Sequence, residues 1–295
     1  MQALEDSVAG ALHADPTLRH LQSVLIARRG EPLLEQYFRD RRPTDLSNIH
    51  SVTKSVLATL AGIAIEQGSL SLETRERNIS VEQLLTMTAG LEAATPYDID
   101  DIADRGESWV TGPLAAPPRA VPGTTFIYNN GAAHVLGMVI ARATGTPLAA
   151  FAEQHLFGPL GIDYYRWPRD PDGNPLGYGH LELRPRDLLR LGQLYLDRGA
   201  VEARRVVPAS FVAAATSPHS AGGPPENVPY GYLWWITEDA GHPSFFAGGF
   251  GGQYVTVVPE LALVVVTTGD AAVLTRTSGN PRRLVSDVII PALST

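Results

Sequence analysis

The apolar residues of this chain follow a strand-like pattern near both ends and a helical pattern in the middle. Short alternating or continuous apolar runs indicate strands, whereas apolar residues spaced three and four apart indicate helices. Strands are predicted at residues 23–27 and 33–38, which form a hairpin, and at 232–237, 254–258 and 261–268. Helices are predicted at residues 3–22, 52–68, 81–88, 132–144, 186–197 and 278–290. Residues 92–125 and 218–229 are rich in turn-forming residues and are predicted to be irregular.

Strands at both ends of a chain, with helices between them, constrain the fold strongly. Both ends must complete one sheet, and the helical segment is inserted between its strands. We therefore predict an α/β sheet lobe from residues 1–50 together with 200–295, and a mainly helical lobe from residues 51–199. A chain of 295 residues can bury a large core in such an arrangement.

The composition excludes several classes of function. Hydrophobic residues make up 44% of the chain and charged residues 18%, which is typical of a globular protein. The formal net charge of −8 argues against a nucleic-acid partner or an anionic membrane surface. The absence of cysteine excludes disulfides, thiolate metal sites and a cysteine nucleophile. There is no H-E-x-x-H motif either, so no metal and no cofactor are expected.

No segment of the sequence is typical of a membrane span. The longest apolar run, residues 261–266, is far too short to cross a bilayer. The first 30 residues lack a basic segment followed by an apolar run, so no signal peptide is visible. A cytoplasmic location is therefore expected, although the removal of a leader would leave the same picture.

The chain contains a single lysine, Lys54, among 23 basic residues. Arginine keeps its proton near neutral pH whereas a buried lysine can release it, so a lone lysine is a candidate for chemistry that arginine cannot perform. Ser51 lies three residues earlier, at the start of a predicted helix, and this spacing puts both side chains on one helix face. Chance would place a serine there roughly once in twenty. Because a desolvated lysine can take or relay the hydroxyl proton, Ser51 is the candidate nucleophile.

Tyr128, Asn129 and Asn130 lie between a Pro-Gly turn and the helix predicted from residue 132. A tyrosine at a loop–helix junction can reach into a cleft, and its phenol can transfer protons when a positive charge is near. Asn130 offers a donor and an acceptor to a substrate amide. A packed tyrosine with a capping asparagine would leave the same pattern.

Four glycines surround Phe250 just before a predicted strand. Glycines at this place let backbone N–H groups approach a ligand closely, which suits an oxyanion hole or substrate contact made by Gly249, Phe250 and Gly251. A flexible entry into a hairpin is the alternative for this segment.

Two histidines and a tryptophan are weaker candidates, as residues that line a cleft. His180 follows a Gly-Tyr-Gly segment, and His242 precedes the glycine-rich segment. Trp235 is typical of a core, although it would also suit the wall of an acyl pocket. The chain has no G-x-S-x-G elbow and no Walker A loop, so α/β-hydrolase and P-loop NTPase assignments are excluded.

These groups occur in the order of a known family. The chain resembles the serine β-lactamase and penicillin-binding-protein clan, and specifically its class C-like branch of esterases, D-amino-acid peptidases and small-amide hydrolases. Ser51-Val-Thr-Lys54 matches the S-x-x-K motif, Tyr128-Asn-Asn130 matches Y-x-N, and residues 248–252 stand at the place of the third motif. The likeness runs from about residue 22 to the C-terminus, with similar connecting segments at 84–91, 122–130, 157–161, 186–192 and 230–235.

The resemblance implies a β-lactamase/transpeptidase-like fold, with a mixed antiparallel sheet flanked by helices, an all-helical lobe and the site between them. It also implies that Ser51 attacks a carbonyl and forms an acyl-enzyme that water then releases. Lys54 and Tyr128 would share the proton transfers, and which of them is the principal base stays open. Asn130 would hold the lysine and the substrate. The N–H groups of Ser51 and Phe250 would form the oxyanion hole.

The third motif departs from the family pattern. Relatives that process β-lactams carry a lysine there, which helps to bind the carboxylate of the drug, whereas residues 247–249 of this chain are Ala-Gly-Gly. The predicted function is therefore hydrolysis of a small-molecule ester or amide, as in a carboxylesterase. A β-lactamase or D-amino-acid peptidase is the alternative, and a non-catalytic binding member of the same fold is a second one. The oligomeric state is not predicted.

Overall fold

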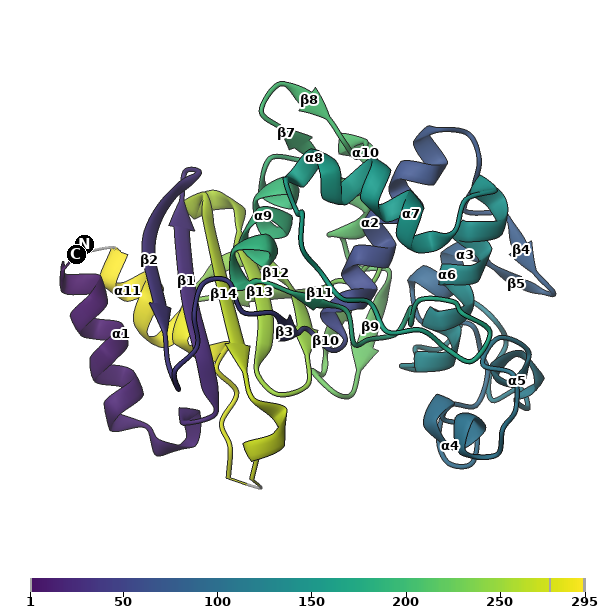
Figure 1. The fold of residues 1–295 in the computed structure, drawn as a ribbon, viewed down its shortest axis with the longest axis horizontal. Coiled ribbons are helices and arrows are strands. Elements are labelled where there is room, and N and C mark those ends of the chain that lie inside the picture. Colours follow the sequence, from purple (N-terminus) through teal and green to yellow (C-terminus); the bar gives the residue numbers. More distant parts are fainter. Residues whose placement is uncertain (1, 276, 294–295) are drawn as a thin grey trace.

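A computed structural model of the chain describes residues 2–275 and 277–293, with one eight-stranded sheet beside a group of helices (Figure 1). The strand order is β2-β1-β14-β13-β12-β11-β10-β9, and each neighbouring pair is antiparallel. The strands are β1 (Leu21–Arg28), β2 (Glu31–Tyr37), β9 (Ser220–Gly223), β10 (Val228–Tyr230), β11 (Trp235–Asp239), β12 (His242–Gly249), β13 (Gln253–Val258) and β14 (Leu263–Gly269). The prediction that both chain ends complete one sheet is confirmed.

The central strands are covered on both faces, which explains their nearly continuous valine-rich sequence. In β14 every residue is buried. Val265 faces a cluster with α1 (Gln2–Ala14) and the C-terminal segments η5 (Val285–Ile289) and α11 (Ile290–Leu293). Val264 and Val266 point to the opposite face, where α9 (Pro185–Leu196) lies.

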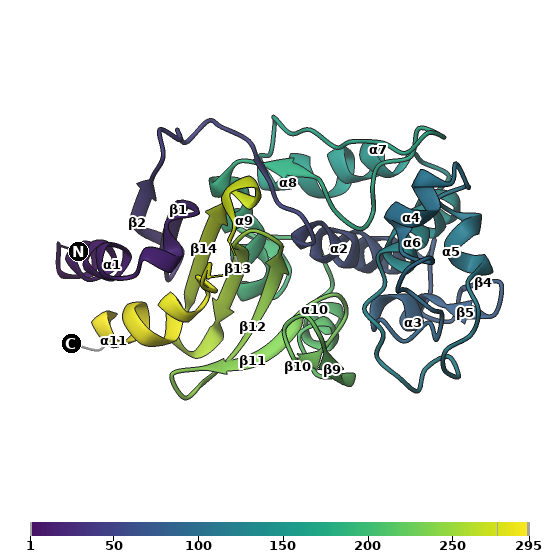
Figure 2. The ribbon, with the colours of Figure 1, turned by 90° about the horizontal axis from the view of Figure 1, so that it is seen from below.

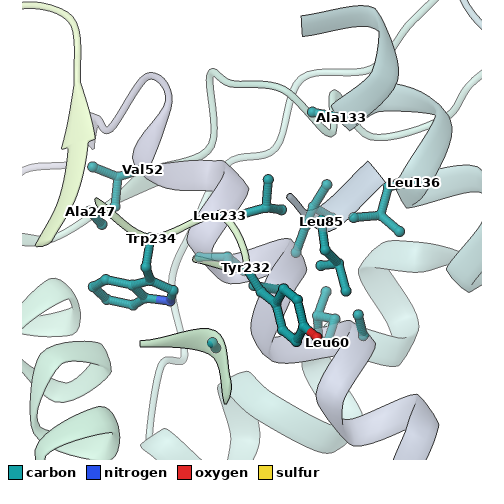
Figure 3. Packing of buried hydrophobic residues seen from close by; sticks show 14 of the residues in the cluster. Val52, Leu60, Leu85, Ala133, Leu136, Tyr232, Leu233, Trp234 and Ala247 are labelled. Carbon is teal, nitrogen blue, oxygen red and sulfur yellow. The ribbon is translucent and has the colours of Figure 1, made fainter. Parts of the chain in front are cut away.

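α2 (Val52–Glu66) runs between the sheet and a group of helices beside it, as Figure 2 shows. Every residue from Val52 to Ala64 is buried. A helix that is mostly apolar on all sides is typical of the centre of a domain. α6 (Asn130–Thr144) packs against it, and α3 (Val81–Leu85) and α7 (Leu148–Ala152) pack against α6. Figure 3 shows part of this core, in which Leu60 of α2, Leu85 and Leu136 belong to one cluster with the segment before β11.

Short elements connect these layers. They are η1 (Pro16–Leu18), β3 (Ser47–Asn48), β4 (Arg75–Glu76), β5 (Ile79–Ser80), α4 (Ile99–Asp104), α5 (Thr111–Ala115), η2 (Glu153–Phe157), α8 (Gly158–Leu160), β6 (Glu182–Leu183), β7 (Ala200–Val201), β8 (Arg204–Arg205), α10 (Ala209–Ala215), η3 (Pro259–Leu261) and η4 (Ala271–Val273). β6 pairs with β3, which ends three residues before Ser51.

The structure corrects the predicted elements at several points. Residues 92–125 contain α4 and α5, and residues 218–229 contain β9 and the start of β10. β12 has no counterpart among the predicted strands, because its glycines and polar residues interrupt the strand pattern, and pairing with β11 and β13 holds it in place. The helix expected over residues 278–290 lies later in the chain, over η5 and α11.

The predicted lobe boundary at residue 199 also needs a correction. α9 falls within the segment assigned to the helical lobe, but it packs against β1, β13 and β14. Gly192 allows this close approach, since a Cβ there would lie 2.5 Å from Val264 Cγ1. α9 is therefore a covering helix of the sheet.

Among the described residues no single helix is long and apolar enough to cross a membrane. α6 and the helical segment at Leu148–Leu160 reach the necessary length and hydropathy only as a pair that is bent by 76°.

Candidate active site

Ser51 lies at the N-terminus of α2, after a loop that is tied to the segment containing β6. The Ile49 N–H donates to the Leu181 carbonyl at 2.9 Å. His50, directly before Ser51, has a positive φ of 46°, and Thr53 Oγ1 donates to its carbonyl at 2.7 Å. These contacts fix the turn into α2 and hold Ser51 on the first turn of a buried helix.

The amine of Lys54 is buried next to Ser51 and contacts three oxygen atoms. Nζ lies 3.0 Å from Ser51 Oγ, 2.9 Å from Asn130 Oδ1 and 2.6 Å from the Tyr178 carbonyl oxygen. The carbonyl and amide oxygens can only accept hydrogen bonds. A neutral amine therefore donates its two N–H groups to them, which leaves its lone pair facing the serine hydroxyl.

The protonation of Lys54 is set by its burial, since only 1% of the residue is exposed. Loss of hydration lowers the pKa of Lys54 from 10.5 to about 7, against a weaker opposing effect of the Asp98 charge. An amine with this pKa is partly unprotonated near neutral pH, so it can accept the proton of the Ser51 hydroxyl.

Tyr128 lies over the same amine. Its ring centroid is 4.8 Å from Lys54 Nζ, and the ring stacks on Trp235 with centroids 5.9 Å apart. Burial raises the pKa of Tyr128, and a hydrogen bond to Ser51 opposes this only in part. Tyr128 is therefore a neutral phenol near pH 7, which can donate or relay a proton but is not an anionic base.

Asn130 is the first residue of α6, and the residues before it fix its place. Asn129 caps the helix, because its Oδ1 accepts the Ala132 N–H at 2.8 Å. The segment before the cap is anchored on Met87, whose carbonyl accepts the Ile127 N–H at 2.8 Å. The asparagine pair thus has two functions, with Asn129 starting the helix and Asn130 contacting the lysine.

The edge of β12 lies beside Ser51. β11 pairs only with the N-terminal part of β12. Among the residues that the structure describes, 247–249 therefore have no neighbouring strand on that side. A Cβ on Gly249 would lie 2.5 Å from the Ile49 carbonyl oxygen and 3.2 Å from the Ser51 nitrogen, so only glycine permits this approach. In the described part of the chain, neither the Ser51 N–H nor the Phe250 N–H has a hydrogen-bond acceptor. Both groups are available to an oxyanion.

Most of the predicted site residues line one cleft of about 460 Å³. They are Ser51, Tyr128, Asn130, Trp235, Gly249, Phe250 and Gly251. Lys54 lies behind Ser51, within hydrogen-bond distance of its hydroxyl. The structure therefore brings the three sequence motifs together, and the side chain of Phe250 stands 66% exposed at the opening.

The two predicted histidines do not line this cleft. His242 lies at the opposite end of β12 from the glycines, with Nδ1 3.0 Å from Glu260 Oε2, so its assignment to the site is wrong. His180 contacts Asn48 and packs its ring 5.5 Å from that of His50. Burial, with smaller effects from the neighbouring positive charges, lowers the pKa of His50 to about 4, so the histidine next to the serine is neutral at pH 7.

The sequence reasoning missed the Tyr178 carbonyl, Glu226 and Tyr254. The carbonyl leaves no signal in a sequence, because any residue at position 178 would supply one. Glu226 and Tyr254 line the cleft near Gly248. The available signal was that Glu226 is the only acidic residue in the Gly/Pro-rich segment 218–229.

A buried pair, His134 and Asp170, braces the loop that carries Tyr178. Both side chains are 0% exposed, and His134 Nε2 lies 3.0 Å from Asp170 Oδ2. Burial lowers the pKa of His134, so the ring is neutral, donates to Asp170 and accepts the Gly177 N–H on Nδ1 at 3.2 Å. Hydrogen bonds from Asn174 and His134 outweigh burial and lower the pKa of Asp170.

Replacement of Asp170 by alanine is expected to lower the free energy of unfolding by about 3 kcal/mol at pH 7, because it leaves buried donors without an acceptor. Since the pKa of Asp170 is lowered in the folded state, its contribution is present above the ordinary value of 3.8 and is lost as the pH falls below it. Denaturant unfolding at pH 7 and pH 3 measures both effects. Asp172→Ala, an exposed change in the same loop, should stay within about 0.5 kcal/mol, and an equal loss in both variants would contradict the brace.

Comparison with known proteins identifies the family. The family model described as Beta-lactamase matches residues 17–286. A 6-aminohexanoate-dimer hydrolase of Paenarthrobacter ureafaciens is 25% identical over 283 residues, which cover 82% of this chain and 70% of the relative. Esterase EstB of Burkholderia gladioli is 32% identical over 199 residues, which cover 53% of this chain and 50% of the esterase.

The fold is also similar to that of solved structures. An octameric penicillin-binding protein homologue from Pyrococcus abyssi matches with a TM-score of 0.77 and 19% identity, over 99% of this chain and 77% of the homologue. At this identity the likeness shows the fold alone.

Proposed function

This chain belongs to the β-lactamase family and is a serine hydrolase, and we propose that it hydrolyses esters or small amides through an acyl-enzyme on Ser51. One observation carries the proposal. Lys54 Nζ lies 3.0 Å from Ser51 Oγ, while two other oxygens accept its remaining hydrogen bonds. A nucleophile within hydrogen-bond distance of a base that a third group orients is the arrangement that covalent catalysis requires.

In the proposed reaction, neutral Lys54 takes the proton of the Ser51 hydroxyl as Oγ attacks the substrate carbonyl carbon. The carbonyl oxygen becomes an oxyanion and accepts the N–H groups of Ser51 and Phe250. The C–O or C–N bond then breaks, and the leaving group takes a proton that Tyr128 relays from the lysine. A water molecule then gives a proton to the same base and attacks the carbonyl carbon of the acyl-enzyme. The bond from this carbon to Ser51 Oγ breaks, Oγ regains a proton, and the acid is released.

The preference for esters and small amides follows from the charge of the cleft. Lys54 is the only lysine of the chain and already contacts Ser51, so no lysine remains to bind the carboxylate of a β-lactam. Gly248 and Gly249 have no side chain that could replace it. The names of two relatives, a 6-aminohexanoate-dimer hydrolase and an esterase, support the same substrate class.

Covalent labelling tests the proposed nucleophile. A fluorophosphonate should add the mass of one phosphonyl group to the intact protein, and peptide mass spectrometry should place it on Ser51. Ser51→Ala should add no mass. Labelling at another residue, or none, would reject the acyl-enzyme and favour a non-catalytic member of the family. Among turnover substrates, a short p-nitrophenyl ester should react faster than nitrocefin, and the reverse order would favour a β-lactamase.

A further inference from the structure

The cleft contains a carboxylate that the proposed reaction does not use. Glu226 lies in the loop between β9 and β10, and Tyr254 donates its hydroxyl to Oε1 at 2.9 Å. The same oxygen is 3.3 Å from the position that a Cβ on Gly248 would occupy. The carboxylate is therefore held in place at the glycine-rich edge of β12, next to the residue that approaches Ser51.

Glu226 is the only acidic side chain among the described residues that line this cleft, and none of them is a lysine or an arginine. The described residues also include no ion pair with Glu226. The charge of Arg282 acts on Glu226, but its guanidinium binds Asp239 at 2.6 Å and lies over the Phe246 ring. Burial raises the pKa of Glu226, as expected for a carboxylate with no directly paired cation.

Aromatic rings accompany this carboxylate. Trp235, Tyr128 and Tyr254 line the cleft together with Glu226. The faces of such rings attract cations, and a carboxylate beside them adds a direct charge interaction. Glu226 also acts on Tyr128 over a short range, since its charge contributes to the raised pKa of that phenol. The chemistry of this region suits a positively charged amine and repels a carboxylate.

The position of Glu226 relative to Ser51 fixes where such an amine would sit. A Cβ on Gly248 would lie 3.3 Å from Glu226 Oε1, and a Cβ on Gly249 would lie 3.2 Å from the Ser51 nitrogen. Because consecutive Cα atoms are ~3.8 Å apart, Glu226 Oε1 and the Ser51 nitrogen are within about 13 Å of each other. An extended chain of several bonds can span this distance from the scissile carbonyl.

We propose that Glu226 forms a subsite for a cationic amine, and that the preferred substrates are esters or amides carrying such an amine several bonds from the scissile carbonyl. The inference rests on the proposed function of Ser51. It also gives a physical reason for the missing lysine of the third motif, since the charge at this edge of the cleft is reversed.

Two matched esters test the subsite. p-Nitrophenyl 6-(trimethylammonio)hexanoate carries a fixed positive charge, and p-nitrophenyl 7,7-dimethyloctanoate has the same shape without it. The ratio of their kcat/KM values should fall about tenfold in Glu226→Gln, which removes the charge and keeps the shape. The ratio cancels any loss that both esters share. Glu238→Gln, on the exposed face of β11, removes the same charge elsewhere and should keep the ratio of the parent.

A binding measurement separates this inference from the proposed function. Titration of hexyltrimethylammonium into Ser51→Ala should give a Kd about tenfold lower than titration into Ser51→Ala with Glu226→Gln. A ratio of kcat/KM that Glu226→Gln leaves unchanged, or equal Kd values, would overturn the subsite. If neither ester is hydrolysed while the Kd values differ, the hydrolase proposal fails and the subsite stands.

Discussion

Replacement of Lys54 by methionine is expected to reduce kcat/KM for a short p-nitrophenyl ester by about 10³–10⁴-fold at pH 8. Methionine is similar in length, but it has no lone pair of comparable basicity and cannot accept the Ser51 proton. Lys54→Arg should lose a similar factor even though the positive charge stays, because a guanidinium does not release its proton. Steady-state hydrolysis with each purified variant measures both losses.

The pH dependence of the parent protein identifies the base. Lys54 must be neutral to accept a proton, and its pKa is about 7, so kcat/KM should rise as the pH passes through 7. The residual activity of either Lys54 variant should lack this rise. If the rise persists in both variants, the titrating base is another group, and Tyr128 becomes the first candidate.

Unfolding is a separate cause of lost activity, and the Tm of Lys54→Met tests it. Burial lowers the pKa of Lys54 in the folded state. Below pH 7 the buried amine is nevertheless charged, and this buried charge lowers the free energy of unfolding. This unfavourable contribution to stability shrinks as the pH rises from 7 toward 10.5. Methionine removes this contribution, but it also leaves Asn130 Oδ1 and the Tyr178 carbonyl without a donor. Because the two effects oppose each other, the Tm of Lys54→Met at pH 7 should stay close to that of the parent. A clear fall in Tm would indicate that the loss of kcat/KM comes from unfolding.

The parts of the site that could be predicted are those that depend on spacing within one helix. Ser51 and Lys54 share a face because they are three residues apart, and helical periodicity from residue 52 already places both at its start. The predicted helix begins at residue 132, whereas α6 begins at Asn130, so the sequence placed Asn130 next to the helix but not in it. The approach of these two helix starts could not be predicted, because it depends on how α2 and α6 pack.

The parts that could not be predicted depend on neighbours distant in sequence. β12 is a strand because β11 and β13 pair with it, although its glycines disfavour a strand by themselves. Because this strand was not predicted, the closeness of His242 to the glycines in the sequence suggested that they are also close in space. Strand residues rise about 3.3 Å each, so His242 and Gly249 lie roughly 23 Å apart at opposite ends of β12. Glu226 reaches the cleft only because a loop folds over this strand.

Gly249→Ala is expected to lower kcat by about 10²–10³-fold while KM changes little. The added Cβ would lie 2.5 Å from the Ile49 carbonyl oxygen, and a backbone oxygen cannot turn away as a flexible side chain can. The end of β12 must therefore move away from α2. Because Phe250 follows directly, its N–H moves away from that of Ser51, and the oxyanion loses one of its two donors. Stopped-flow and steady-state hydrolysis of the same ester measure the loss.

Gly10→Ala provides the matched control, since a Cβ on this residue of α1 meets nothing within 4 Å and should leave kcat unchanged. Fluorophosphonate labelling gives an independent readout, because the phosphonyl oxygen uses the same two N–H groups as the acyl oxyanion. Its rate should fall in parallel with kcat in Gly249→Ala, with circular dichroism unchanged. If kcat stays within threefold of the parent, or if labelling keeps its rate, then the edge of β12 does not supply an oxyanion donor, and stabilisation of the tetrahedral intermediate must come from other groups in the cleft.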